Sequence, residues 1–288
     1  MKGLSIVVPC YNEEKSVVKT IEDLTSTISK LRINFEIIAV DDHSSDKSLE
    51  LLQDCKGPLS IISNDIQLGY GGALKRGIAK AKHDAVLIID ADGTYSCDSI
   101  PQLIQTFEKE GLDMVVGSRT KKDSQISRSR KFGKWFIVKL ATYLSGRHIP
   151  DLNSGLRIMK KEVIDKFIHI LPNGFSFTTT ITLAMLTNNH FVKYIPIDYL
   201  KRTGRSKIRP FKDTSNFFLL VARTIMYFDP LKIFLPLSAV LFFVGLILIL
   251  IRIFVRPMLI STTIITFVAG FMILSLGLLA DLIDKRTK

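Results

Sequence analysis

Short apolar runs alternate with amphipathic stretches over residues 1 to about 117 of the chain. Such runs, bounded by polar clusters, predict strands at Leu4–Val8, Phe35–Val40, Leu59–Ile62, Ala85–Ile89 and Met114–Val116. Strands that alternate with helical patterns are typical of a mostly parallel sheet with crossover helices. The sequence therefore predicts an α/β fold for this part of the chain.

Two connecting segments carry the spacing of an amphipathic helix. Between the first two strands, apolar residues recur every three or four positions, at Val17, Ile21, Leu24, Ile28 and Leu31. Asn12 is placed to cap this helix. Further along, Ser99 and Pro101 mark the start of a helix over Ile100–Glu108, because proline fits the first helical turn.

The C-terminal part contains two long uncharged runs, 19 residues from Ile233 to Ile251 and 23 residues from Met258 to Ala280. At about 1.5 Å per helical residue they would be about 28 and about 34 Å long, against a hydrocarbon core of about 30 Å. A buried helical pair of a soluble protein is the alternative, but such helices usually carry a polar stripe and these do not. The sequence therefore predicts a hairpin of two transmembrane helices, at about 232–252 and 258–280.

The start of the chain and the charges around the hairpin indicate an orientation. The chain starts with the strand-like LSIVVP and shows no signal-peptide pattern, so we expect the large N-terminal part to stay in the cytoplasm. An even number of spans returns the C-terminus to the same side, where Lys285, Arg286 and Lys288 join Lys232. We therefore expect an integral membrane protein, of the plasma membrane in a prokaryote, whose head faces the cytoplasm.

Basic residues outnumber acidic ones by 39 to 27, which gives a net charge of +12. They gather with aromatic residues between Arg119 and Arg147, and an aromatic-rich stretch, Phe211–Asp229, leads into the first long apolar run. Both segments are interpreted as lying on the membrane surface, with a solvated basic loop and an ordinary core helix as the alternative. Anionic lipids and phosphorylated substrates are the expected partners, whereas no nucleic-acid-binding motif is present.

The three cysteines show no CxxC spacing, which fits a reducing compartment without structural zinc.

Polar clusters follow three of the predicted strands: PCYNE after the first, DDHSSD after the second and DADGTYS after the fourth. In open α/β sheets, ligands bind outside the carboxyl ends of the strands. Asp90 and Asp92 are close enough to repel each other, and Gly93 indicates a tight turn. A hard cation such as Mg²⁺ or Mn²⁺ would offset that repulsion and still coordinate a diphosphate. An ordinary acidic turn is the alternative for so short a motif.

Six motifs in order extend this picture: IVVPCYNEE at 6–14, VDDHSSD at 40–46, DADGT at 90–94, GSR at 117–119, DLNSGLR at 151–157 and RTGRSK at 202–207. Together they resemble family 2 glycosyltransferases with the GT-A fold, and more closely the polyprenyl-phosphate sugar transferases of the dolichol-phosphate mannose synthase group. The resemblance runs over about 207 residues. With the apolar runs, it implies a cytosolic GT-A domain over 1–210, a juxtamembrane interfacial segment with amphipathic helices over 211–230, and a transmembrane hairpin over 231–288.

The resemblance also implies roles for individual acidic and apolar residues. Five residues would bind the base and ribose of a nucleotide: Pro9, Tyr11, Glu13, Val40 and Asp42. Asp90 and Ala91 would line the sugar nucleotide, and Asp92, with Asp90, would hold the metal. Some relatives carry a glutamine two positions after the second acid, where this chain has Thr94, so the third protein ligand stays open. The alternatives are helix-dipole stabilisation for Glu13 and a turn cap for Asp42.

Basic residues are assigned to phosphates. Arg119, Arg202 and Lys207 match positions that the resembling enzymes use for donor or acceptor phosphates, and Arg119 joins the two acids as a catalytic residue. Arg128 and Arg130 are added because the planar fork of arginine suits phosphate geometry. The alternative is a basic patch that only attracts anionic headgroups. The glycine-rich LGYGGALKRG at 68–77 has Leu74 where a dinucleotide fingerprint needs its third glycine. It is interpreted as the tight start of a helix that packs near the nucleotide, with a phosphate contact as the weaker alternative.

The region after SGLR contains no Asp or Glu from Gly174 to Met185. An acceptor hydroxyl needs a base to remove its proton, whereas a phosphate oxygen is already anionic. We therefore predict a membrane-bound inverting glycosyltransferase that moves a hexose from a nucleoside diphosphate sugar, of the UDP-glucose or GDP-mannose type, to dolichyl or undecaprenyl phosphate. A processive polysaccharide synthase is a weaker alternative because no QxxRW motif is present, and a non-catalytic nucleotide-sugar-binding membrane adaptor is another. The sequence leaves homo-oligomerisation open.

Overall fold

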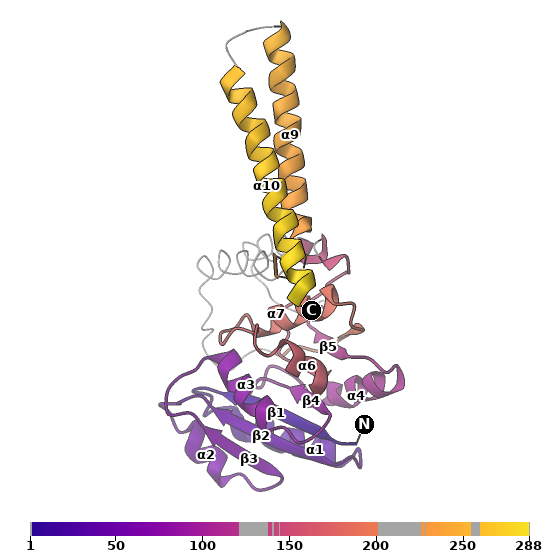
Figure 1. Ribbon diagram of the computed structural model, residues 1–288. Coiled ribbons are helices and arrows are strands. Elements are labelled where there is room, and N and C mark those ends of the chain that lie inside the picture. The colour runs from indigo at the N-terminus through magenta and orange to yellow at the C-terminus, as the bar shows by residue number, and fades with distance from the viewer. Residues whose placement is uncertain are drawn as a thin grey trace.

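A head built on one β-sheet and a long helical hairpin make up the part of the protein that the structure describes (Figure 1). The structure, a computed structural model, describes residues 2–120, 138–139, 141–143, 145–200, 226–227, 229–254 and 260–287. The hairpin consists of α9 (Leu231–Phe254) and α10 (Ile260–Thr287), which extend away from the head and bring the C-terminus back to it near α7 (Figure 1).

Within the described residues the strands form a seven-stranded sheet in the order β3-β2-β1-β4-β6-β5-β7. The strands are β1 (Leu4–Cys10), β2 (Phe35–Asp41), β3 (Leu59–Ser63), β4 (Ala85–Ile88), β5 (Met114–Ser118), β6 (Arg157–Lys160) and β7 (Val192–Pro196). All neighbours pair in parallel except β6, which runs antiparallel between β4 and β5. The predicted α/β fold with a mostly parallel sheet is confirmed.

The five strands predicted from apolar runs are all present, with ends extended or shortened by one or two residues. Two further strands were not predicted. β6 has the sequence RIMK, too short and too charged at its ends to stand out, although three of its four residues are buried. β7 lies at the sheet edge and is half-exposed, so its sequence VKYIP lacks the continuous apolar character of a buried parallel strand.

Helices cover both faces of the sheet. On one face, the even-numbered residues of β1 pack with α1 (Val17–Ser29), α2 (Ser48–Asp54) and α4 (Ile100–Lys109), which follows the short 3₁₀ helix η1 (Cys97–Ser99). On the other face lie α3 (Tyr70–Lys80), α6 (Lys161–Phe167) and α7 (Phe177–Thr187). Because strand side chains alternate between faces, Ile6 and Val8 enter the first core and Val7 enters the second.

The first predicted helix is present, but its predicted cap is wrong. α1 begins at Val17, directly after Ser16, and its buried face contains Val17, Ile21, Leu24 and Ile28 as predicted. Asn12 instead has a positive φ of 53° and its side-chain oxygen accepts a hydrogen bond from Ser45 N at 2.8 Å. Leu31 lies beyond the end of the helix. The asparagine therefore joins two loops rather than capping a helix.

The two hairpin helices pack closely through glycine–phenylalanine contacts. A Cβ added at Gly245 of α9 would lie 2.7 Å from the Phe267 ring of α10. A Cβ at Gly277 of α10 would lie 2.5 Å from Phe234 of α9. Small residues at a helix crossing allow the backbones to approach, which is typical of membrane helix pairs. By length and composition, Leu231–Ile251 and Ile260–Ile283 are able to cross a membrane, and the predicted two-helix hairpin is confirmed.

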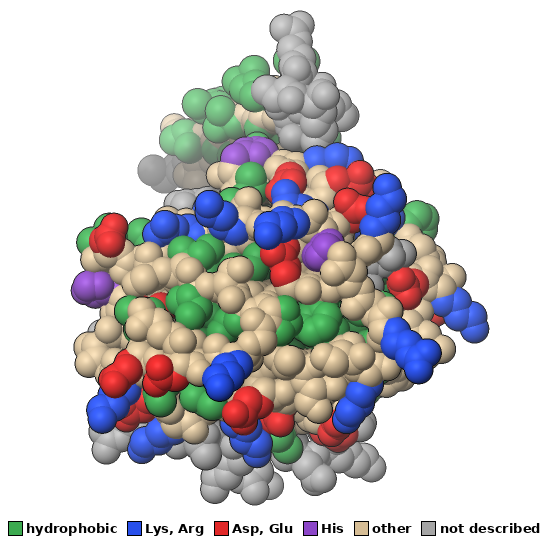
Figure 2. Space-filling view, turned by 90° about the horizontal axis from the view of Figure 1, so that it is seen from below, with side chains coloured by type: hydrophobic (Ala, Val, Ile, Leu, Met, Phe, Trp, Pro, Cys, Tyr) green, Lys and Arg blue, Asp and Glu red, His purple; other side chains and the backbone are tan. Residues whose placement is uncertain are grey.

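Several predictions fall outside the described residues. These are the basic segment around Trp135 and most of the aromatic stretch that begins at Phe211. Of the aromatic residues within Arg119–Arg147 and Phe211–Asp229, the structure describes Tyr143 and Tyr227, whose side chains are exposed. The interfacial role and the domain boundaries at 210 and 230 stay predictions. On the face of the head turned away from the hairpin, acidic and basic side chains are interspersed around a band with few charges (Figure 2).

Candidate active site

The predicted polar clusters meet at one edge of the sheet. Strand β1 is parallel to β2 and β4, with Cys10 opposite Asp41 and Val7 opposite Ile88. The residues that follow these three strands therefore leave the sheet at the same carboxyl edge, which is where open α/β sheets bind ligands.

Pro9 and Val40, both predicted to contact the nucleotide, are direct partners in the β1–β2 register. Pro9 is tolerated in a central strand because the described β4 pairing ends at Val7 opposite Ile88, so the missing N–H of proline interrupts no ladder bond on that side. Tyr11 and Glu13 follow in the first loop, and Glu13 N donates to Ser48 Oγ at 2.8 Å. Asp42 N donates to Cys10 O at 2.8 Å, so the structure brings the chain segments that carry all five predicted nucleotide residues to one place.

Asp42 is buried, and its carboxylate receives three hydrogen bonds from a later loop. Leu68 N and Gly69 N donate to its two carboxylate oxygens, each at 2.8 Å, and Asn64 Nδ2 donates at 2.7 Å. The carboxylate is therefore fixed in orientation by the segment that precedes α3. All three donors come from residues 64–69, so this carboxylate bonds a loop more than 20 residues further along the chain.

The acid pair lies in a tight turn directly after β4, as predicted from Gly93, whose φ is 69°. Asp90 and Asp92 are half-buried, and Ala91 between them is buried. Thr94 donates to Asp92 Oδ1 from both its backbone N, at 3.1 Å, and its hydroxyl, at 2.6 Å. Thr94, at the position where the sequence left the third metal ligand open, therefore orients Asp92.

Asp90 is held by residues that sequence reasoning did not assign. The Tyr70 hydroxyl donates to Asp90 Oδ1 at 2.8 Å. On another side the carboxylate packs against the Cα of Gly155, where an added Cβ would lie 2.3 Å from Oδ2. Burial raises the pKa of Tyr70 well above its ordinary value, and the negative charge of Asp90 adds to that rise, so the hydroxyl keeps its proton and donates.

Arg119, predicted as a phosphate ligand, forms a two-point ion pair with the buried Asp151. Arg119 Nε and Nη2 each donate at 2.8 Å to different oxygens of Asp151, and Arg119 N donates to the same carboxylate at 3.1 Å. Burial alone would lower the pKa of Arg119, but hydrogen bonding to Asp151 raises it well above the ordinary value. The guanidinium also lies over the Tyr199 ring, 5.3 Å from its centroid. Its orientation is thus set by two residues that were not predicted.

Tyr95 links this pair to the acid turn. Its hydroxyl accepts a hydrogen bond from Gly155 N at 2.6 Å, and its ring contacts that of Tyr199 edge-on at 5.3 Å. Because Gly155 also supports Asp90, the segment 151–157 contacts both the arginine and the acid pair. The motif DLNSGLR was noticed in the sequence, but only its resemblance to relatives indicated a role, since these contacts span distant parts of the chain.

Arg157 connects the segment 151–157 to the protein interior through hydrogen bonds of its buried side chain. Its side chain is fully buried, donates from Nε and Nη2 to Ser154 O, and donates from Nη1 to Thr178 O and to Thr182 Oγ1 at 2.9 Å. Burial lowers the pKa of this guanidinium, although nearby tyrosines oppose that effect. Arg157 therefore ties the turn at residues 154–155 to helix α7.

Four predicted phosphate-binding residues lie outside the described part of the chain: Arg128, Arg130, Arg202 and Lys207. Among the described residues, no cluster of three or more His, Cys, Asp or Glu side chains forms a preassembled metal site. The pair Asp90 and Asp92 nevertheless fits a hard divalent cation that keeps further coordination for a substrate. Both offer carboxylate oxygens from one turn, and protein donors fix each carboxylate.

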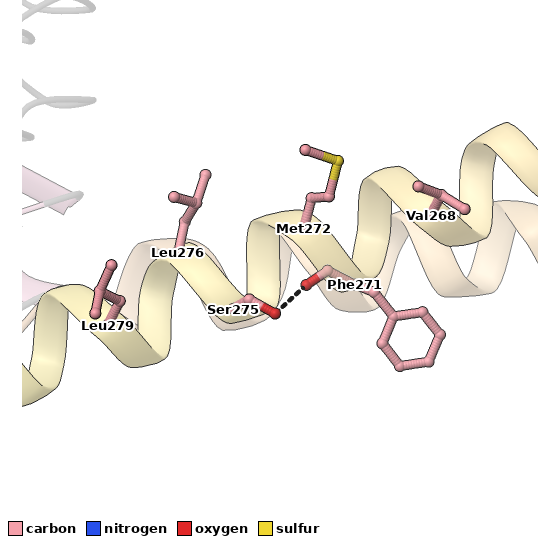
Figure 3. A pocket seen from close by; sticks show the side chains of 6 residues that line it. All are labelled: Val268, Phe271, Met272, Ser275, Leu276 and Leu279. Atoms are coloured by element: carbon pink, nitrogen blue, oxygen red, sulfur yellow. Dashed lines mark hydrogen bonds between the residues drawn. The ribbon is translucent and has the colours of Figure 1, made fainter.

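An apolar groove on the surface belongs to the hairpin rather than to this site. Val268, Met272, Leu276 and Leu279 line it on one side of α10, together with Phe271 and Ser275 (Figure 3). Ser275 Oγ donates to Phe271 O at 2.8 Å, so its hydroxyl is satisfied within the helix. A surface of this composition suits hydrocarbon.

Comparison with known proteins shows the family. Residues 5–168 match Glycosyl transferase family 2, and residues 229–285 match the GtrB C-terminal hairpin. The first match covers more than half of the chain, and the chain belongs to glycosyl transferase family 2. The predicted enzyme class, a glycosyltransferase, is confirmed.

Several curated proteins are similar. The undecaprenyl-phosphate 4-deoxy-4-formamido-L-arabinose transferase of Proteus mirabilis is 34% identical over 190 residues, which are 61% of this chain and 57% of that protein. The dolichol-phosphate mannosyltransferase of Pyrococcus furiosus is 27% identical over 218 residues, 72% of this chain and 59% of that protein. The dolichyl-phosphate hexose transferase of Haloferax volcanii is 28% identical, over 72% of this chain and 87% of that protein. The chain spans less than two thirds of the length of the first two relatives.

Among solved structures, glucosyl-3-phosphoglycerate synthase from Mycobacterium tuberculosis, in complex with Mn²⁺, UDP-glucose and phosphoglyceric acid, is similar in fold. The TM-score is 0.58 at 19% sequence identity, over 78% of this chain and 79% of that one. At this identity the likeness concerns the fold alone, and the predicted GT-A architecture is confirmed.

Proposed function

We propose that this protein is a membrane-bound inverting glycosyltransferase that moves a hexose from a nucleoside diphosphate sugar to a polyprenyl phosphate. The observation that carries the proposal is the turn after β4, where Asp90 and Asp92 leave the carboxyl edge of a family 2 glycosyltransferase domain. The hairpin extending from that domain supports a substrate in the membrane. The similar proteins named as undecaprenyl-phosphate and dolichol-phosphate sugar transferases support the same acceptor class.

Asp92, with Asp90, would hold Mg²⁺ or Mn²⁺, which supplies neutralising charge for the diphosphate leaving group. The similar synthase from Mycobacterium tuberculosis was solved with Mn²⁺ and UDP-glucose, which supports this pairing of metal and donor class. Thr94 and Tyr70 orient the two carboxylates, so their geometry is prepared before substrate arrives.

The nucleotide would bind where Pro9, Val40, Tyr11 and Glu13 meet, beside the fixed carboxylate of Asp42. Pro9 and Val40 supply an apolar wall, and the loop residues supply polar groups, the combination that small-ligand sites use. Arg119 would bind a phosphate of the donor or the acceptor. Its pair with Asp151 engages Nε and Nη2, two of the positions from which a guanidinium donates.

In the reaction, an anionic oxygen of the lipid phosphate attacks the anomeric carbon of the sugar. The new bond joins that carbon to the phosphate oxygen, while the bond to the diphosphate oxygen breaks and its electron pair leaves with the nucleoside diphosphate. Attack opposite the leaving group inverts the configuration. No proton has to be removed, and this agrees with helix α7, which contributes buried threonines and no carboxylate after Phe177.

The test is sugar transfer by the purified full chain in detergent. We expect labelled UDP-glucose or GDP-mannose, with Mn²⁺ and a short polyprenyl phosphate, to give a labelled lipid. Asp92→Asn keeps the size of the side chain but removes its charge, and we expect it to lower the rate at least about 100-fold. A wild-type rate for Asp92→Asn would refute the role of the acid pair.

The head is proposed to face the cytoplasm, where nucleotide sugars are made. The structure places both ends of the hairpin at the head, so the head and the C-terminus would lie on one side of the membrane (Figure 1). Protease treatment of sealed inside-out and right-side-out vesicles distinguishes the two orientations. Cleavage of the head only in inside-out vesicles is the expected result.

A further inference from the structure

Tyr70 holds one member of the acid pair from helix α3, which the sequence analysis placed near the nucleotide without a role for Tyr70. It is the first residue of α3, and its hydroxyl donates to Asp90 Oδ1 at 2.8 Å across 20 residues of sequence. The ring is stacked on Phe175, with centroids 5.7 Å apart and an interplanar angle of 18°. The hydroxyl is therefore aimed by a ring that cannot swing without losing this stack.

Gly155 limits Asp90 from another side. An ideal Cβ at Gly155 would lie within 2.6 Å of all three carboxyl atoms of Asp90, which shows that the carboxylate rests flat on the glycine backbone. The Gly155 backbone and the Tyr70 hydroxyl together restrict the orientation of the Asp90 carboxylate. Arg157 fixes the support in turn, through its two bonds to Ser154 O.

Residues 68–70, which include Tyr70, also orient the carboxylate of Asp42. Leu68 N and Gly69 N bind the Asp42 carboxylate, and the next residue, Tyr70, binds Asp90. Gly69 makes this possible because its φ of 87° turns the chain sharply into α3, and because an added Cβ would lie 2.7 Å from Asn173 O. Residues 68–70 thus set the relative positions of an acid after β2 and an acid after β4.

We propose that Tyr70 is a positioning residue of the active site: its hydroxyl fixes Asp90 in the orientation that the divalent metal and the sugar nucleotide require. This inference rests on the proposed function for the divalent metal at Asp90 and for the identity of the substrates. Partners that orient a metal ligand typically contribute about 10- to 100-fold to metal affinity or activity. The hydroxyl is expected to act in that range.

Tyr70→Phe is the decisive variant, because it removes the hydroxyl and keeps the ring that stacks on Phe175. The matched control is Tyr194→Phe, since Tyr194 is also a partly buried tyrosine of the head and no described residue bonds its hydroxyl. Two readouts are used on the full chain in detergent. One is binding of Mn²⁺ alone, followed by the loss of its free-ion electron paramagnetic resonance signal, and the other is the rate of sugar transfer.

We expect Tyr70→Phe to weaken Mn²⁺ binding, to lower kcat about 10- to 100-fold, and to leave the melting temperature within a few degrees of wild type. Tyr194→Phe should match wild type in both readouts. Wild-type Mn²⁺ affinity and kcat in Tyr70→Phe would overturn the proposal, as would absence of Mn²⁺ binding to the wild-type chain. If the acceptor class is wrong, transfer to lipid fails in the wild type, but the Mn²⁺ titration still decides on Tyr70.

Discussion

Asp151 holds Arg119 with both carboxylate oxygens, through two side-chain hydrogen bonds of 2.8 Å and a third bond from the arginine backbone. The aspartate is 1% exposed, and the arginine follows β5 at the edge of the candidate site. A guanidinium oriented in this way presents its remaining N–H groups in a fixed direction. The ion pair therefore stabilises the head and also positions the Arg119 guanidinium, which we propose binds a phosphate.

Removing the Arg119–Asp151 ion pair should lower the free energy of unfolding of the head. Asp151→Asn leaves the Arg119 charge partly buried without its carboxylate, and breaking such a pair costs about 3 kcal/mol. Denaturant unfolding of the full chain in detergent, followed by circular dichroism, measures this loss. The matched control is Asp165→Asn, which breaks the exposed pair with Lys161 and should change the free energy of unfolding by less than about 1 kcal/mol. Equal effects of the two changes would contradict this account.

A methyl group at residue 155 should displace Asp90. The Cβ of Gly155→Ala would overlap the carboxylate of Asp90, with Oδ2 only 2.3 Å away, so either the turn or the acid must move. We expect sugar transfer to fall at least about tenfold while the protein remains folded. Gly174→Ala serves as control, because an added Cβ there meets no atom within 4 Å. Full activity of Gly155→Ala would show that the orientation of Asp90 does not matter.

The three cysteines should differ in reactivity. Burial raises the pKa of Cys10 and of Cys97 to about 12, whereas Cys55 is only half-buried and its pKa is raised less strongly. Because the thiolate is the reactive form, a pKa near 12 leaves about one thiolate in 10,000 at pH 8. Mass spectrometry after labelling of the native protein with iodoacetamide should find Cys55 modified first. Labelling of Cys10 ahead of Cys55 would be inconsistent with the described packing.

Asp113 should make stability depend on pH in the acidic range. Burial alone would raise the pKa of Asp113, but hydrogen bonds from Lys160 Nζ, Phe191 N and His190 lower it below its ordinary value of 3.8. A carboxyl whose pKa is lower in the folded state stabilises the fold at pH above its unfolded value. That contribution is lost as the pH falls through the lowered value, because the unfolded chain then binds the proton more readily.

The check compares denaturant unfolding of wild type and Asp113→Asn at pH 7 and at pH 3. The free energy of unfolding of the wild type should fall more between these two conditions than that of the variant. An identical fall in both proteins would mean that Asp113 has no altered pKa.

The sequence was sufficient for the elements with strong local patterns. The turn after β4 was predicted because Gly93 follows two acids at the end of a buried run. The hairpin was predicted because the chain contains uncharged runs of 19 and 23 residues there. β6 was missed because four residues with charged ends give no pattern, and it is a strand only because β4 and β5 both pair with it. Local periodicity says nothing about such pairing.

For the candidate site too, local motifs predicted some residues, and contacts between distant parts of the chain were missed. Asp42, Asp90, Asp92 and Arg119 were predicted as site residues from motifs, whereas the partners that orient them were not predicted. Tyr70 reaches Asp90 across 20 residues, and Asp151 reaches Arg119 across 32. Both contacts depend on how α3 and the segment 151–157 fold onto the sheet edge. Motifs identify residue types, whereas orientation is a property of the tertiary structure.

The central claim, transfer to a lipid phosphate without a catalytic base, is tested most directly by comparing two acceptors. The purified chain with Mn²⁺ and labelled sugar nucleotide is given either a polyprenyl phosphate or the polyprenol of the same length. The account predicts a labelled lipid from the phosphate and none from the alcohol, at a rate that Asp92→Asn abolishes. Equal labelling of the polyprenol, or labelling of neither lipid with any nucleotide sugar, would contradict it.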